Sequence, residues 1–206
     1  MMKIVESIRS AIETEAVALT NLAKYIDQAY ALAIQCLLDC QGKVIIIGVG
    51  KSGIIGRKMA ASFSSTGKPA LFVHAAEAVH GDSGVIEQKD LVILISNSGE
   101  TQEVLAVLPI IKKIGSKRIA ITSDKNSTLA ASCDVILSYD YEREADHLNL
   151  APTTSSVLAL AIGDAIAVTL SGLNNFDKEQ FYTYHPGGSL GEQLSSSSRE
   201  RKGQGM

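Results

Sequence analysis

The sequence predicts an α/β fold in which helices flank a doubly wound, five-stranded parallel sheet. Five short runs rich in Val, Ile and Leu are spaced along the chain, and helical patterns lie between several of them. Short apolar runs of this kind are typical of strands buried on both faces, and strands that alternate with helices favour a parallel sheet. The 206 residues suffice for one such domain with a substantial core and leave little room for a second.

Two helices are predicted ahead of the first strand. Apolar residues recur at roughly helical spacing over residues 4–26, with charged residues between them, and a second helix is expected over residues 28–38. Further helical patterns cover residues 54–64 and 102–114, and Gly115 stands where the latter should end. The predicted strands are residues 43–48, 70–73, 91–95, 118–122 and 135–138.

A long apolar helix is predicted after the last strand, beginning after Pro152 and ending near Leu173. Gly163 and Asp164 interrupt its apolar run, which is too short for a comfortable membrane span. We therefore expect a buried helix in the domain and no membrane partner.

The composition predicts a globular domain followed by a polar tail. Hydrophobic residues make up 46% of the chain and charged residues 20%, and the formal net charge is −3. This balance gives no reason to expect nucleic acid as a partner. Residues 195–206 are polar and contain glycine, which predicts a disordered tail and assigns residues 1–194 to the domain.

The cysteines and the start of the chain predict a cytoplasmic location. Cys36, Cys40 and Cys133 are an odd, sparse set, which is no disulfide framework and indicates a reducing compartment. Cys36 and Cys40 stand one helical turn apart in an apolar run, so we interpret them as core thiols rather than as a metal-binding pair. The first residues include acids and lack the continuous apolar stretch of a signal peptide.

The loop after the first strand is a candidate binding loop. Ligands of doubly wound sheets bind beyond the carboxyl ends of the strands, where the strand order reverses. Here Gly48, Gly50 and Gly53 surround Lys51 and Ser52. Glycines let the backbone approach a ligand and the following helix offers free N–H groups, so Gly50 and Ser52 are candidate binding residues and Lys51 a candidate anion contact. The spacing also fits a dinucleotide-binding turn or a plain strand-to-helix turn.

The loop after the third strand is richer in polar side chains. Three hydroxyls and one amide directly follow a buried strand and open a helix, which predicts a neutral donor site for a phosphate monoester. Helix capping alone would need only one such residue. Two acids at the helix start, Glu100 and Glu103, leave one carboxylate for capping and one for sugar hydroxyls. The candidate phosphate ligands are Ser96, Asn97, Ser98 and Thr101.

Glu144 and a second hydroxyl-rich helix start lie after the last strand. The helix begins near Thr153 and Ser155, so more donors converge on the same edge of the sheet. Because charged residues surround Glu144, a solvated loop acid is the plain alternative to a functional carboxylate.

Two of the four histidines are candidates for function. His74, His80 and Asp82 could in principle bind a metal, but a spacing of six does not place both rings on one helix face, so no metal site is predicted. His185 precedes a stiff Pro-Gly-Gly turn, and we expect that turn to present its ring.

Five motifs together resemble one family. They are Gly-Val-Gly-Lys-Ser-Gly (48–53), His-Gly-Asp-Ser-Gly (80–84), Ser-Asn-Ser-Gly-Glu-Thr (96–101), Leu-Ala-Pro-Thr-Thr-Ser-Ser (150–156) and His-Pro-Gly-Gly (185–188). In this order they are similar to the arabinose-5-phosphate isomerases of the SIS (sugar isomerase) family. The resemblance covers about residues 6–194 and adds His80 to the expected substrate contacts.

The resemblance implies interconversion of D-ribulose 5-phosphate and D-arabinose 5-phosphate, in the route to Kdo for lipopolysaccharide. Moving a carbonyl to the next carbon needs a base and an acid–base partner for the oxygens, but no redox cofactor or metal. Lys51, Glu103, Glu144 and His185 match the family's catalytic set. We assign Glu144 as carbon base, His185 to ring opening or oxygen protons, Lys51 to charge stabilisation and Glu103 to hydroxyl orientation, with the two glutamates open to exchange. A homotetramer with shared sites is implied.

Two departures from the family pattern stand out. Such isomerases commonly continue into a tandem pair of CBS domains, so this chain resembles a shorter form. Asp146-His147 stands where the family often has Cys-Pro, which bears on substrate choice.

Two other functions compete with the isomerase. An NAD-dependent dehydrogenase would explain the glycine spacing, but it needs an acid at the end of the second strand, where His74 stands and Glu77 fits poorly. A SIS-type sensor that only binds a sugar phosphate is the second alternative, and the absence of a basic helix-turn-helix pattern argues against it.

Overall fold

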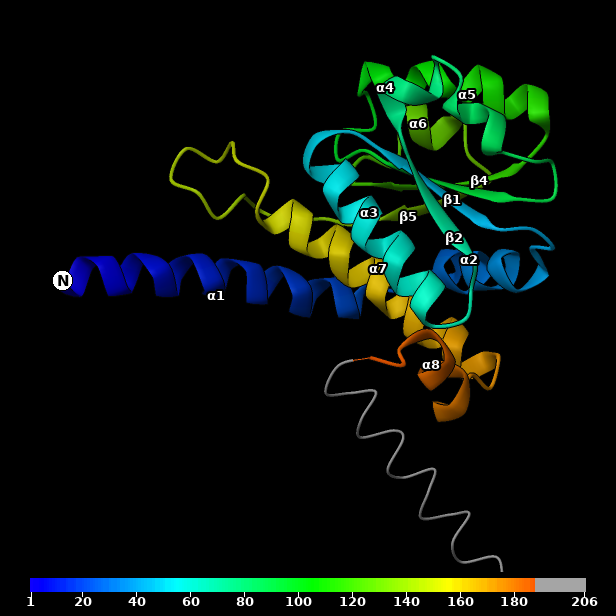
Figure 1. Ribbon diagram of the computed structural model, residues 1–206. Helices are drawn as coiled ribbons and strands as arrows, with labels where there is room; N and C mark the ends of the chain where they lie inside the picture. The colour runs from blue at the N-terminus through cyan, green and yellow to red at the C-terminus, as the bar shows by residue number, and fades with distance from the viewer. Residues whose placement is uncertain (188–206) are drawn as a thin grey trace, which may run out of the picture.

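The computed structural model describes residues 1–187, and the predicted tail lies outside this range. A five-stranded, fully parallel sheet has the order β2-β1-β3-β4-β5, as predicted (Figure 1). The first strand, β1, has β2 on one side and β3, β4 and β5 in succession on the other, which is the doubly wound arrangement. The strands are β1 Val44–Gly48, β2 Ala70–His74, β3 Leu91–Ile95, β4 Lys117–Thr122 and β5 Val135–Ser138.

Five long helices match the sequence pattern, and four short elements were not predicted. Segments of four to seven residues are too short to show a helical period, although α8 carries a capping box between Asp177 and Gln180. The predicted helices are α1 Met2–Lys24, α2 Gln28–Asp39, α3 Gly50–Ser65, α5 Gln102–Ile114 and α7 Thr154–Leu173. The additional ones are α4 Ala75–Ala78, the 3₁₀ turn η1 Asp82–Val85, α6 Thr128–Ala131 and α8 Lys178–Tyr184.

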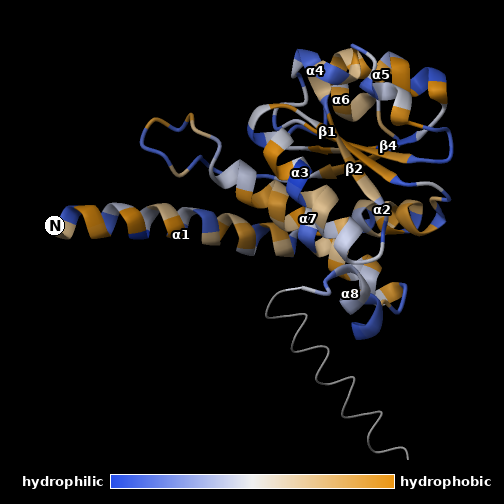
Figure 2. Cartoon of the chain, viewed as in Figure 1, coloured by the Kyte–Doolittle hydropathy of each residue, from blue (hydrophilic) through white to orange (hydrophobic). Residues whose placement is uncertain are grey.

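The sheet separates two apolar cores because strand side chains alternate between its faces. Ile46 and Ile93 point into the core under α2, α3 and α7, whereas Ile45, Val92 and Leu94 point into the core under α4, α5 and α6. All five residues of β1 are buried. Figure 2 shows the apolar strands enclosed between these helical layers.

Helix α7 is long and apolar enough to cross a bilayer by composition, but it lies in the core of the domain. Nine of its residues are buried, and it packs against α3 and α1. A Cβ added at Gly163 would lie 2.5 Å from the Met59 side chain, so the glycine permits close contact with α3. The predicted buried helix is confirmed.

The N-terminal half of α1 projects away from the domain (Figure 1). Only Ala18 and Leu22 of this helix are buried. Ile4, Ile8 and Ile12 are each about 60% exposed and recur every four residues on one face. Within one chain this apolar stripe has no covering element among the described residues.

Candidate active site at the carboxyl end of the sheet

A cavity of about 260 Å³ opens at the carboxyl edge of the sheet, where the strand order reverses between β1 and β3. The first turns of α3 and α7 and the β3–α5 loop form its walls. Three helix N-termini therefore surround one space, and their free N–H groups and dipoles favour an anion there. The predicted residues that line the cavity are Lys51, Ser52, Asn97, Ser98, Thr101 and Ser155.

The hydroxyls of the β3–α5 loop differ in position, because some hold the loop together and others line the cavity. Ser96 is buried, and its Oγ lies 2.8 Å from Thr101 Oγ1 and accepts from the Gly99 N–H at 3.1 Å. Ser98 is exposed and lines the cavity. Gly99 has φ +68°, and a Cβ there would lie 2.0 Å from Ser127 Oγ, so the turn requires glycine. Ser96 thus shapes the loop that presents Ser98.

Asn97 is held between two tyrosines that the sequence analysis missed. Tyr139 Oη donates to Asn97 Oδ1, and Asn97 Nδ2 donates to Tyr141 Oη, both at 2.9 Å. The Asn97 carbonyl accepts from Thr122 Oγ1 and Ser123 Oγ. The signal in the sequence was a pair of tyrosines two residues apart, directly after the last strand.

Glu144 is a buried carboxylate bound by neutral donors. It accepts the backbone N–H of Thr153 at 2.8 Å and of Ser155 at 3.2 Å, together with the hydroxyls of both residues. Burial alone would raise its pKa, but the hydrogen bonds from Ser155 and Thr153 hold the pKa below the ordinary value. No ion pair among residues 1–187 includes it. Glu144 is therefore a fixed negative charge at the start of α7.

The remaining predicted residues on this side are exposed. Lys51, in the first turn of α3, lines the cavity. Gly50 begins α3 with φ +58°. Glu103 is exposed in the first turn of α5, and His80 is exposed after α4; neither lines the cavity in the single chain.

His185 is not beside Lys51 within one chain. It follows α8, where its ring stacks on Phe181 at 4.1 Å between centroids and its Nδ1 lies 3.0 Å from the Phe181 carbonyl oxygen. The preceding Phe176 stacks on Tyr184 and contacts Gly67, just past the end of α3. Lys51 stands at the other end of that helix, whose 16 residues span about 24 Å.

Asp146, where the sequence departs from the family pattern, organises its own loop. Its carboxylate accepts the backbone N–H groups of Leu148, Leu150 and Ala151 at 2.8–3.0 Å. His147 is exposed. Asp146 thus holds the loop after Glu144 together through backbone hydrogen bonds.

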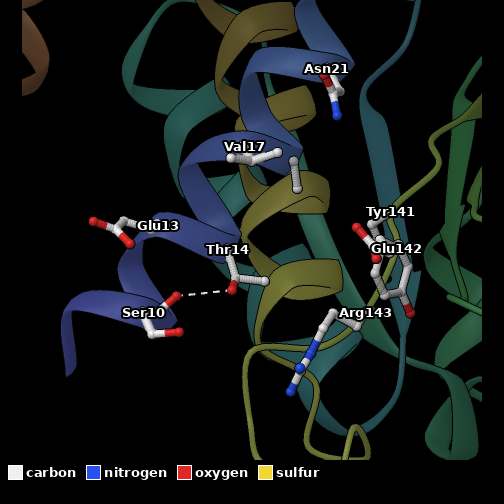
Figure 3. A pocket seen from close by; sticks show the side chains of 9 residues that line it. Ser10, Glu13, Thr14, Val17, Asn21, Tyr141, Glu142 and Arg143 are labelled. Carbon is white, nitrogen blue, oxygen red and sulfur yellow. Dashed lines mark hydrogen bonds between the residues drawn. The ribbon is translucent and has the colours of Figure 1, made fainter. Parts of the chain in front are cut away.

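A second cavity of about 290 Å³ lies between α1 and residues 141–143 (Figure 3). Glu13, Asn21 and Arg143 are among its lining residues, and Tyr141 forms part of its wall. Two carboxylates, Glu13 and Glu142, and one cation, Arg143, line it, so these side chains provide no excess positive charge for an anion. Within residues 1–187, no group of three His, Cys, Asp or Glu side chains is placed to hold a metal.

Comparison with known proteins identifies the family. The profile of the SIS domain matches residues 37–169. The chain belongs to the SIS family.

This SIS chain is similar to Escherichia coli proteins of one enzyme class. It is 46% identical over 192 residues to arabinose 5-phosphate isomerase KpsF, covering 93% of this chain and 59% of KpsF. It is 47% identical over 184 residues to arabinose 5-phosphate isomerase KdsD of strain K12, covering 89% of this chain and 56% of KdsD. The chain thus spans less than two thirds of the length of these relatives.

A solved structure gives a match over nearly its full length. The E. coli CFT073 protein c3406, in complex with arabinose 5-phosphate, superposes with a TM-score of 0.88 at 48% identity, covering 90% of this chain and 98% of that one. In the SIS chain described here, β2 ends on His74, and Glu77 lies in α4 rather than at the strand end. An NAD ribose would therefore lack the acid that its recognition requires.

Proposed function

We propose that this SIS chain is an arabinose-5-phosphate isomerase, which interconverts D-ribulose 5-phosphate and D-arabinose 5-phosphate through an enediol and supplies Kdo synthesis. The observation that carries the proposal is the cavity enclosed by three helix N-termini, with Lys51 and Ser98 on its wall and Glu144 beside it. The similarity to KpsF, KdsD and c3406 supports the same substrate.

The phosphate of the sugar binds at the β3–α5 loop. Ser98 and Thr101 offer hydroxyls, and the free N–H groups of the first turn of α5 add backbone donors. These neutral donors bind a dianion without a broad basic surface, in agreement with the net charge of −3. The phosphate does not react, so the loop holds it equally in the ground and transition states.

The reacting carbons lie toward Glu144 and Lys51. We assign Glu144 as the base that moves the proton between carbons, and Lys51 as the cation that stabilises the enediolate. The lowered pKa of Glu144 keeps it ionised at neutral pH, although it also weakens the carboxylate as a proton acceptor. Glu103 is the alternative base, because its exposed carboxylate is not committed to capping a helix.

His185 completes the site of a neighbouring subunit. Its position near the far end of α3 and the uncovered apolar stripe of α1 both support shared sites in a homotetramer. Two inactive variants, Glu144→Gln and His185→Ala, should then complement each other when coexpressed. In a random mixture about a quarter of the sites would combine one intact copy of each residue. Mixed oligomers with no activity above the parents would contradict the shared site.

The first experiment is a turnover assay on ribulose 5-phosphate with a chelator present and no added metal. We expect arabinose 5-phosphate as the product, since an enediol mechanism needs only acid–base groups and fixed donors. Activity that required a divalent ion would contradict the metal-free mechanism. Binding of the sugar phosphate without turnover would identify a sensor instead of an enzyme.

A further inference from the structure

Two tyrosines connect the phosphate-binding loop to the segment that leads into Glu144. Tyr139 and Tyr141 follow β5 and stack with 6.3 Å between ring centroids. Both hydroxyls meet the Asn97 side chain, one at its oxygen and the other at its nitrogen, at 2.9 Å. Asn97 belongs to the loop that carries Ser98, so the loop is tied to the segment that leads into Glu144.

The two hydrogen bonds of the Asn97 side chain fix which group donates and which accepts at each tyrosine. Tyr139 donates to the Asn97 oxygen, which leaves the Asn97 nitrogen as donor to Tyr141. Because the Tyr141 oxygen accepts this bond, its own proton is available to a different acceptor.

Tyr141 lies close enough to the Glu144 carboxylate for that charge to influence its pKa. Burial raises the pKa of Tyr141 most, and the adjacent Glu144 carboxylate raises it further, against hydrogen bonds from Asn97 and Ser155 that lower it. Tyr139 is buried as well, with a raised pKa to which burial contributes most, followed by Tyr141 and Glu144. Both phenols therefore stay protonated at neutral pH and act as fixed hydrogen-bonding groups.

We propose that Tyr141 is a positioning residue that links the phosphate-binding loop to Glu144 and fixes the distance between the bound phosphate and the reacting carbons. The inference rests on the proposed function. A five-carbon phosphosugar spans both regions, so a small displacement of either one moves the carbons relative to the carboxylate. A small misplacement of the reacting atoms lowers turnover strongly.

The two tyrosines should differ in their effect. Tyr141→Phe removes the hydroxyl that accepts from Asn97 and lies beside Glu144, so we expect kcat to fall about tenfold and KM to change less. Tyr139→Phe removes only the hydrogen bond to the Asn97 oxygen in the β3–α5 loop. It should therefore raise KM more than it lowers kcat.

Tyr30→Phe is the matched control. The Tyr30 hydroxyl donates to the Ser138 carbonyl oxygen at 3.0 Å, and burial raises its pKa to about 12, but it touches neither Asn97 nor Glu144. It should leave kcat and KM at the wild-type values while lowering the unfolding temperature. A Tyr141→Phe enzyme with wild-type kcat, or with the same kinetic profile as Tyr30→Phe, would overturn the proposal.

A measurement on the unmodified protein covers the case in which Tyr141→Phe fails to fold or the wild type shows no isomerase activity. With ¹³C-labelled tyrosine rings, inorganic phosphate should shift the signals of Tyr139 and Tyr141 and leave Tyr30 unchanged. Saturation with phosphate without a response at Tyr141 would contradict the link to the loop. A response in a protein that lacks turnover would support the link and contradict the isomerase assignment alone.

Discussion

Two buried carboxylates at opposite ends of the sheet are stabilised in different ways. At the amino end, Asp90 accepts the Lys43 ammonium at 2.7 Å, the Lys43 N–H at 2.9 Å and the Glu87 N–H at 2.8 Å. At the carboxyl end, the partners of the Glu144 carboxylate within residues 1–187 are hydroxyls and backbone N–H groups. Both have a pKa below the ordinary value, but within residues 1–187 only the Asp90 carboxylate forms an ion pair.

This difference fits a structural role for Asp90 and the proposed catalytic role for Glu144. The Lys43 ammonium neutralises Asp90 and joins the start of β1 to the start of β3. Glu144 keeps its negative charge beside a cavity whose helix N-termini compensate it. A carboxylate that is stabilised without a cation can accept a proton or orient a ligand without first breaking an ion pair.

The largest expected effect is on turnover in Glu144→Gln. The amide keeps the size of the side chain but cannot accept a proton from carbon, so kcat should fall about 10²–10⁴-fold with little change in KM. Solvent deuterium wash-in at C2 of the ketose, followed by NMR, should fall in parallel.

Glu103→Gln is the matched control for the role of the base. If Glu144→Gln keeps normal exchange and Glu103→Gln loses it, the two assignments must be exchanged. A modest parallel loss in both variants would mean that neither carboxylate is the carbon base.

Asp90→Asn should lower stability and leave turnover unchanged, the opposite of Glu144→Gln. Its amide places N–H groups against the donors of Lys43 and Glu87, and removing one partner of a buried pair is strongly destabilising, here by about 2–4 kcal/mol in the free energy of unfolding. Turnover per folded molecule should not change, since the site lies at the other end of the sheet.

Glu87→Gln tests whether burial decides the size of that effect. Glu87 also contacts Lys43, at 3.4 Å, but its side chain is 56% exposed. Exposed pairs contribute little, so denaturant unfolding should barely change. If the Asp90 and Glu87 variants lost equal amounts of unfolding free energy, the number of charges near Lys43, rather than their burial, would set the stability of this region.

Within the β3–α5 loop, we expect one serine to affect substrate binding and the other to affect stability, each by less than the carboxylates do. Ser98→Ala should raise KM several-fold with kcat nearly unchanged, because an exposed hydroxyl that holds an unreacting phosphate contributes about 1 kcal/mol. Ser96→Ala should mainly lower the unfolding temperature, since its hydroxyl bonds to Thr101 and Gly99. An increase in KM confined to the Ser96 variant would reverse the division within the loop.

The smallest expected effect is on the acid limb of stability. Asp90 and Glu144 both have a folded pKa below their ordinary values of 3.8 and 4.5. Their stabilisation is therefore complete above these values and is lost as the pH falls through the lowered pKa of the folded protein. Between pH 5 and pH 3, Asp90→Asn should lose less stability than the wild type does.

The sequence by itself determined the sheet, its five strands and the loops that surround the cavity. Buried strands and amphipathic helices have different local periods, and polar residues at helix starts identify which N-termini can bind an anion. Lys51, Asn97, Ser98 and Ser155 could therefore be assigned to one edge of the sheet from local patterns alone.

Only the tertiary structure decided how those residues divide their roles. Local spacing does not tell which hydroxyl of the Ser96–Thr101 segment turns inward, or that Tyr139 and Tyr141 reach back 42 and 44 residues to Asn97. Nor does it show that His185 packs on Phe181 near the far end of α3 rather than beside Lys51. The direction of a side chain and its long-range partners depend on packing between elements, which no short stretch of sequence contains.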